Sequence, residues 1–155
     1  MRIMKKLLIL LIVTISVFMI SCGAFKHYED TNGSDDYSLQ YITEEMLIKE
    51  NSGLRIASVS TTTNEGAYKV IKQSCSRFDG VEELYVVKSG SYEVIVTFNV
   101  EQGNGRLVLT DGNSVIHEFG INSEEETFSF TAYKKYYFKV AGEDLGYDIT
   151  IKIAK

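Results

Sequence analysis

The side chains that could do chemistry in this 155-residue chain are few and far apart in the sequence. There are two histidines, His27 and His117, and two cysteines, Cys22 and Cys75. A nucleophile needs a base beside it, which makes Cys75 with His117 the candidate catalytic pair. No G-x-S-x-G sequence accompanies His117, and a free cysteine usually packs as a small buried hydrophobe. We therefore expect a solvated strand-face histidine, a buried structural thiol and no catalytic residue.

Metal ligands are equally scarce. Zinc would need three or four Cys and His side chains at motif spacing, and the chain does not supply them. Calcium takes 6–8 oxygen ligands, and both Asp111-Gly112-Asn113 and Glu143-Asp144 place such oxygens on predicted turns. The same residue types are what tight turns need for backbone reasons. Turn chemistry is the favoured interpretation, a calcium ion is the alternative, and we expect no metal and no cofactor. The run 124–126 is interpreted as solvated charge before a strand.

Tyrosines offer the best candidate for binding. Tyr133, Tyr136 and Tyr137 lie close together with two lysines between them. If Tyr136 faces the core of a predicted strand, Tyr137 faces the other side, and Tyr133 lies near the strand entry. Exposed tyrosines can stack on sugar rings or anchor a protein contact, so Tyr133 and Tyr137 are the candidate ligand-binding residues. The favoured interpretation of these two tyrosines is still that they only stabilise a solvated sheet face, since a chain rich in tyrosine places several on its surface.

A hydrophobic period of two predicts the strands that carry these residues. Apolar side chains alternate with polar ones in several stretches, which marks strands with one buried and one solvated face. The clearest sets are Tyr92, Val94, Val96, Phe98 and Val100, and Tyr147, Ile149, Ile151 and Ile153. The predicted strands are 54–61, 67–77, 82–88, 91–101, 106–110, 114–119, 125–131, 136–141 and 147–153.

Short glycine- and asparagine-rich stretches separate these strands and supply the positive φ that turns need. The strongest hairpin prediction joins 91–101 to 106–110 through Gly103-Asn104-Gly105. Short strands with turn signals every 8–12 residues are typical of an all-β fold. We predict an antiparallel β-sandwich, jelly-roll or immunoglobulin-like, of about seven to nine strands.

One short helix is predicted over residues 42–50. Thr43 can cap its N-terminus, and Glu44 and Glu45 suit the positive end of the helix dipole. Ile42 and Leu47 have the spacing of a hydrophobic staple. A helix of this length needs tertiary packing to be stable.

The N-terminus has the pattern of a secretion signal. Arg2, Lys5 and Lys6 precede an uncharged run from residue 7 to residue 20. Such a basic start followed by about 7–15 apolar residues is typical of a signal peptide, and the run is short for a membrane span of about 20 residues. We therefore expect this segment to direct the chain out of the cytoplasm.

The residues Met19-Ile20-Ser21-Cys22 resemble the lipobox of bacterial lipoproteins, in which signal peptidase II cuts before a cysteine whose thiol carries a diacylglycerol. The resemblance implies a signal peptide over 1–21 and lipidation of Cys22. Residues 22–41 are then the lipidated cysteine with a flexible acidic tether, and 42–155 are the β-sandwich domain. Two acyl chains anchor a protein stably, so we expect the cell membrane, extracytoplasmic face, as its location. The alternative is an ordinary signal or an uncleaved anchor in which Cys22 is incidental.

Charge excludes one class of partner. Residues 1–21 hold three basic residues and no acidic one, so the remainder has 13 basic and 21 acidic residues and a net charge of −8. An acidic domain has no electrostatic footprint for nucleic acid, and none is expected as a partner.

The domain is similar in pattern to small lipoproteins of Gram-positive bacteria, with a Y-x-I-x-I-like last strand at Tyr147, Ile149 and Ile151. We predict a non-catalytic binding or interaction module with an unknown protein or carbohydrate ligand. A cell-surface hydrolase using His117, Cys75 or turn carboxylates, or a purely structural envelope protein, is the alternative.

Overall fold

The computed structural model describes residues 39–155, so the predicted signal peptide, Cys22 and the tether up to residue 38 lie outside the described residues. One helix and six strands follow in order: α2 (Glu44–Lys49), β1 (Ser52–Glu65), β2 (Tyr68–Val87), β3 (Gly90–Thr110), β4 (Val115–Phe119), β5 (Glu126–Ala132) and β6 (Tyr136–Ala154). All strand pairs are antiparallel. The sheet order is β1-β2-β6-β3-β4, and β5 also pairs with β3. Within 39–155 no helix is long and apolar enough to cross a membrane.

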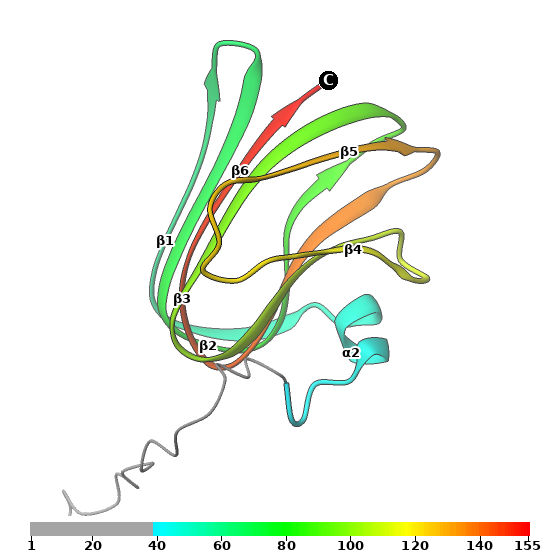
Figure 1. Ribbon diagram of the computed structural model, residues 1–155. Helices are drawn as coiled ribbons and strands as arrows, with labels where there is room; N and C mark the ends of the chain where they lie inside the picture. The colour runs from blue at the N-terminus through cyan, green and yellow to red at the C-terminus, as the bar shows by residue number, and fades with distance from the viewer. Residues whose placement is uncertain (1–38) are drawn as a thin grey trace, which may run out of the picture. The chain divides into compact units, whose positions relative to one another are not determined.

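The sheet folds over on itself into two layers, because β2, β3 and β6 are long and each bends near its middle (Figure 1). Layer A consists of β5 with 58–65 of β1, 68–75 of β2, 90–100 of β3 and 147–154 of β6. Layer B consists of β4 with 52–56 of β1, 78–87 of β2, 104–110 of β3 and 136–145 of β6. The predicted all-β sandwich is confirmed.

Each of the four strands that cross from one layer to the other carries one residue with positive φ at its bend. These residues are Ala57 in β1 (φ 49°), Gly80 in β2 (φ 112°), Gly103 in β3 (φ 72°) and Asp144 in β6 (φ 55°). The strand register also shifts beside the last three. An extra residue in one strand bends it and increases its twist. The sheet therefore bends from layer A to layer B at these positions.

The bends correct two predictions. There are six continuous strands rather than seven to nine, since three pairs of predicted strands are the two halves of β2, β3 and β6. The predicted hairpin at Gly103-Asn104-Gly105 is wrong: Gln102 pairs with Gly146 and Asn104 pairs with Glu143, so β3 continues along β6 through the bend. Glycine supplies the positive φ there, but the chain bends instead of reversing.

The core lies between the two layers and is rich in aromatic side chains. Tyr147, Ile149, Ile151 and Ile153 are all buried, as their alternation predicts. Tyr147 of layer A meets Phe78 of layer B edge to face at 6.0 Å between ring centroids. At the far side, Phe130 of layer A stacks on Tyr136 of layer B at 5.9 Å. Such pairs contribute beyond their buried area, so they hold the layers together.

The helix α2 packs on the outer face of layer B. Thr43 caps it, accepting a hydrogen bond at Oγ1 from the Met46 amide (3.3 Å), as predicted. Leu47 is fully buried against Val81, Val108 and Ala141. Lys139 donates from Nζ to the carbonyl oxygens of Ile48 and Glu50, both at 2.7 Å, which satisfies the C-terminal end of the helix.

Glu143 fixes the chain that leads into the helix. Its carboxylate accepts backbone hydrogen bonds from Gln40, Tyr41 and Ile42. Burial raises the pKa of Glu143, but these three hydrogen bonds outweigh burial, and the pKa lies below its usual value. Residues 40 and 41, which the sequence places at the end of the tether, are therefore attached to the domain.

Candidate functional site

A groove of about 420 Å³ opens between the two layers at the end of the sandwich that is opposite the bends. Because β2 folds back on itself, its first residues in layer A face its last residues in layer B across this groove. Three tyrosines line it: Tyr68 at the start of β2, Tyr85 near its end and Tyr92 at the start of β3. The volume falls in the range of about 300–1,000 Å³ that is usual for ligand sites.

Two of the groove tyrosines, Tyr85 and Tyr92, contact neighbouring side chains. Lys69 pairs with Ile153 on the inner face of layer A, and its Nζ lies 5.6 Å from the ring centroid of Tyr85 in layer B, a cation–π distance. Tyr92 stacks on Phe130 at 5.5 Å and donates its hydroxyl to the carbonyl oxygen of Lys88 (3.0 Å). Tyr85 and Tyr92 are therefore oriented before any ligand binds.

The charge of the groove is opposite to that of the chain. Its charged lining side chains are Lys69, Lys88 and Lys155, and Asn64 adds an amide. None of the lining residues is Asp or Glu, although the whole chain carries a net charge of −5. The groove can therefore offer ammonium and amide donors beside aromatic faces.

The two tyrosines predicted from the sequence lie elsewhere. Tyr133 is 85% exposed in the connection between β5 and β6. Tyr137 lies on the outer face of layer B and borders a second hollow of about 350 Å³ with Ile48, Gly112 and Lys139. Neither lines the tyrosine groove.

Tyr68, Tyr85 and Tyr92 were missed as site residues. The sequence places Tyr92 in an alternating strand and the other two in separate predicted strands, with no sign that they meet. A lysine does accompany aromatic or apolar residues at both ends of β2, at 68–69 and at 85–88, where Lys88 directly follows the strand. This pattern predicts a site only when the bend in β2, which brings the two ends together, is known.

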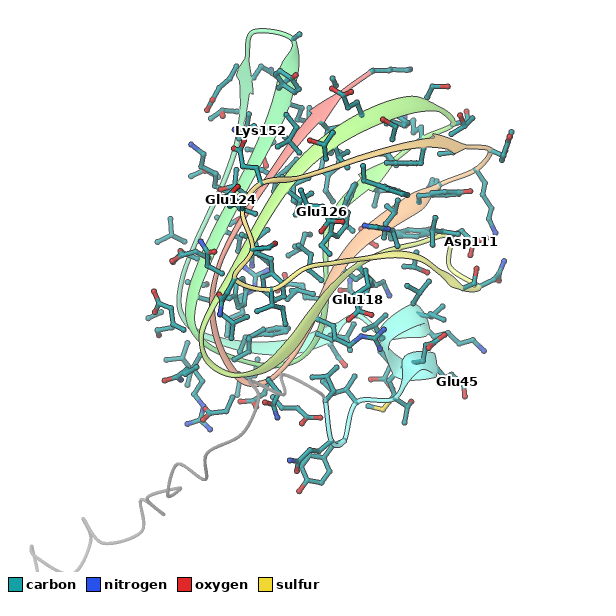
Figure 2. The ribbon with its side chains drawn as sticks, viewed as in Figure 1. Glu45, Asp111, Glu118, Glu124, Glu126 and Lys152 are labelled. Carbon is teal, nitrogen blue, oxygen red and sulfur yellow. The ribbon has the colours of Figure 1, made fainter. Side chains whose placement is uncertain are left out.

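His117 is not the solvated strand-face residue that the sequence predicts. It lies on β4 with its ring stacked on Phe128 of β5, 3.9 Å between centroids. Its Nε2 lies 2.6 Å from Oε1 of Glu126, and the two side chains are only 26% and 30% exposed. Figure 2 shows Glu126 between β4 and β5. This pair joins layer B to layer A at the edge of the sandwich.

Glu126 is thus a half-buried partner of His117 and not simply part of a solvated run. Burial raises its pKa, but hydrogen bonds from the Gly120 amide (2.9 Å) and from His117 outweigh burial, and the pKa of Glu126 lies below its usual value. Its neighbour Glu125 pairs with Lys152 at 2.6 Å. Both carboxylate oxygens of Glu126 therefore have hydrogen-bond partners within the domain.

Cys75 is a buried thiol, as predicted, with 2% of its surface exposed. Its Sγ donates to the carbonyl oxygens of Arg77 (3.0 Å) and Ile56 (3.5 Å). Cys75 lies on β2, which pairs with β1 and β6, whereas His117 lies on β4 at the far side of the sheet order. The structure does not bring together the candidate nucleophile and its candidate base.

The carboxylates considered for calcium are occupied by other groups. Asp111 accepts at Oδ1 from the amides of Asn113 and Ser114 (both 2.8 Å) and pairs at Oδ2 with Lys134 (2.9 Å). The Lys134 contact, followed by these amides, holds the pKa of Asp111 well below its usual range. Asp144 pairs with Arg77 at 2.8 Å. Among the described residues no group of three or more His, Cys, Asp or Glu side chains could hold a metal ion.

Comparison with known proteins gives structural neighbours only. No protein-family model matches the chain, and no curated protein matches it. The C-terminal CBM6 of LamC, a marine laminarinase from Zobellia galactanivorans, is 15% identical; the match covers 67% of this chain and 100% of that one with a TM-score of 0.35. A carbohydrate binding module (CBM6cm-2) from Cellvibrio mixtus lichenase 5A, in complex with cellotriose, is 17% identical; the match covers 66% and 89% with a TM-score of 0.35. The assignment of this chain to the all-β sandwich class rests on its own strand pairing.

Proposed function

We propose that this chain is a non-catalytic binding module that takes a carbohydrate in the groove between the two ends of β2. The observation that carries the proposal is the set of three tyrosines around a groove of about 420 Å³. Tyrosine offers an apolar face on which a sugar ring can stack and a polar hydroxyl at its end. Asn64 and the groove lysines supply donors for sugar hydroxyl groups.

The second part of the proposal is that the module is held at the extracytoplasmic face of the cell membrane by lipid on Cys22. Support comes from the basic, apolar and Ser21-Cys22 succession at the N-terminus. A Cys22→Ala protein should lose its lipid and partition into the soluble fraction. If it stays with the membrane as the native protein does, the lipid anchor is refuted.

Carbohydrate binding is tested with the full-length protein in detergent on a glycan array, followed by calorimetry on the best ligand. Tyr68→Ala removes one groove wall without touching the core, since Tyr68 is not part of the buried cluster. Loss of an aromatic contact of about 1 kcal/mol weakens Kd about fivefold. Tyr85→Ala should weaken binding more than Tyr68→Ala does. Thermal unfolding of each variant checks that the fold survives.

Tyr133→Ala is the matched control, because Tyr133 is an exposed tyrosine outside the groove. It should leave Kd unchanged. If Tyr133→Ala abolishes binding and the groove variants do not, the ligand site is the β5–β6 connection. If no glycan binds, the carbohydrate proposal fails.

A hydrolase is not favoured by the geometry. The ring of His117 is stacked on Phe128 and hydrogen-bonded to Glu126. The thiol of Cys75 is hydrogen-bonded to the carbonyl oxygen of Arg77, and the residue is only 2% exposed. Neither lines the groove. A catalytic nucleophile and base must lie within hydrogen-bond reach of each other, and this pair lies on strands that do not neighbour each other.

A further inference from the structure

Most basic side chains that the structure describes have a hydrogen-bond or ion-pair partner, and those without one are not spread evenly over the surface. Residues 39–155 contain twelve Lys and Arg residues. Eight of them form an ion pair with a carboxylate or donate to backbone carbonyls: Lys49, Arg55, Lys72, Arg77, Arg106, Lys134, Lys139 and Lys152. The remaining four in the described part of the chain are Lys69, Lys88, Lys135 and Lys155, and three of these line the groove.

This distribution is unexpected for an acidic domain. Seventeen Asp and Glu residues lie within 39–155, and several of them pair with Lys or Arg, yet none lines the groove. Lys69 instead faces the ring of Tyr85. Three lysines around one opening, with no acidic side chain among the lining residues, make the potential there locally positive. An anion bound in the groove would meet this positive potential.

We infer that the ligand of the groove is an acidic sugar chain, one whose residues carry carboxylate or sulfate groups. This inference rests on the proposed function, since it names the class of carbohydrate that the same groove takes. The tyrosine faces would stack on the sugar rings, and Lys69, Lys88 and Lys155 would meet the anionic substituents. A lysine ammonium is a compact point charge that does not require one fixed geometry, which suits substituents spaced along a flexible chain.

The net negative charge of the domain sharpens this selectivity. Away from the groove an acidic surface repels polyanions, and this repulsion is screened beyond about 8 Å at physiological salt. A polyanion that binds must therefore do so where the positive charge is local. Affinity should fall as salt rises, because half-exposed ion contacts are screened.

Two matched pairs of probes test the inference with the full-length protein in detergent. The first pair is oligogalacturonate and its carboxyl-reduced counterpart, and the second is dextran sulfate and dextran. At least one acidic member should bind at least tenfold more tightly than its neutral partner. Binding only in the first pair identifies carboxylate as the recognised group, and binding only in the second identifies sulfate.

Charge-reversal variants locate the effect. Lys69→Glu and Lys88→Glu should each weaken acidic-sugar binding by about two- to fivefold or more, the range of single exposed ion pairs. Lys135→Glu is the matched control, because Lys135 is the basic residue without a described partner that lies outside the groove. It should change Kd by less than twofold. Equal loss in all three variants would mean non-specific attraction and would overturn the inference.

The remaining outcomes separate the two proposals. If neutral and acidic sugars bind equally and Lys69→Glu has no effect, acidic selectivity is refuted while carbohydrate binding stands. If no sugar of either kind binds, both fail. If vesicles containing an anionic phospholipid bind through Lys69 and Lys88 and acidic sugars do not, the groove is a headgroup site and the inference is overturned.

Discussion

Replacing Gly103 by alanine tests whether β3 bends at this residue or reverses there. Gly103 has φ +72°, and a Cβ built on it would lie within 3.0 Å of the carbonyl oxygen of Asp144, a separation that real Cβ atoms do not show. Because the backbone fixes the position of a Cβ and the oxygen belongs to the backbone of β6, a rotamer change cannot relieve the clash. Gly66 is the matched control: its φ is +62°, and a Cβ added there would have nothing within 4 Å of it.

Both substitutions place an alanine in a left-handed backbone conformation, but only Gly103→Ala also creates a steric clash. A left-handed conformation costs an L-residue about 1–2 kcal/mol, and the lost freedom of the unfolded chain returns about 0.4–1 kcal/mol. Gly66→Ala should therefore lower the free energy of unfolding by about 1 kcal/mol. Forced overpacking adds about 1–3 kcal/mol, so Gly103→Ala should lower it by about 2–4 kcal/mol.

Urea denaturation followed by far-ultraviolet circular dichroism measures both values. A result for Gly103→Ala that equals the result for Gly66→Ala would mean that Gly103 lies in an open turn. The bent-strand description of β3 would then be wrong.

The contacts of the helix, of Glu143 and of Cys75 each make a further prediction. Leu47→Ala should lower the free energy of unfolding by about 2–5 kcal/mol in urea titrations, since Leu47 is fully buried. The control Glu45→Ala, at an exposed position of the same helix, should change it by less than about 0.5 kcal/mol. Equal effects would mean that the helix does not pack on layer B. The pKa of Glu143 is lowered in the folded state, so its stabilising contribution is present above the unfolded pKa and is lost as pH falls through the folded value. Stability measured below about pH 4.5 should fall less steeply for Glu143→Gln than for the native chain, and parallel curves would refute the role of the carboxylate. Cys75 should react with a thiol reagent only as fast as the protein unfolds; rapid labelling at neutral pH would contradict its burial.

The sequence predicts those features that depend on neighbours along the chain. The alternation at Tyr147, Ile149, Ile151 and Ile153 identifies a strand and its buried face, and all four side chains are buried. Thr43 and Leu47 identify the helix and its contact side in the same way. Both patterns are local consequences of the period of each element.

Features that depend on distant partners could not be predicted in this way. Glycine at 103 signals positive φ, but the same φ serves a hairpin or a bend, and only the pairing of β3 with β6 decides between them. His117 is polar and lies on a predicted strand, and its contacts with Phe128 and Glu126 arise from a strand in the other layer. The groove likewise needs the bend in β2 to bring Tyr68 and Tyr85 to one opening.

A titration followed by nuclear magnetic resonance tests the central claim most directly. Oligogalacturonate or dextran sulfate is added to isotope-labelled protein, and the chemical shift of each backbone amide is recorded. Ligand binding in the groove predicts the largest shift changes at Lys69, Tyr85 and Tyr92, with Tyr133 and Tyr137 unaffected. Changes centred on Tyr133 or Tyr137 would contradict the account, as would the absence of any change at saturating concentrations of both ligands in turn.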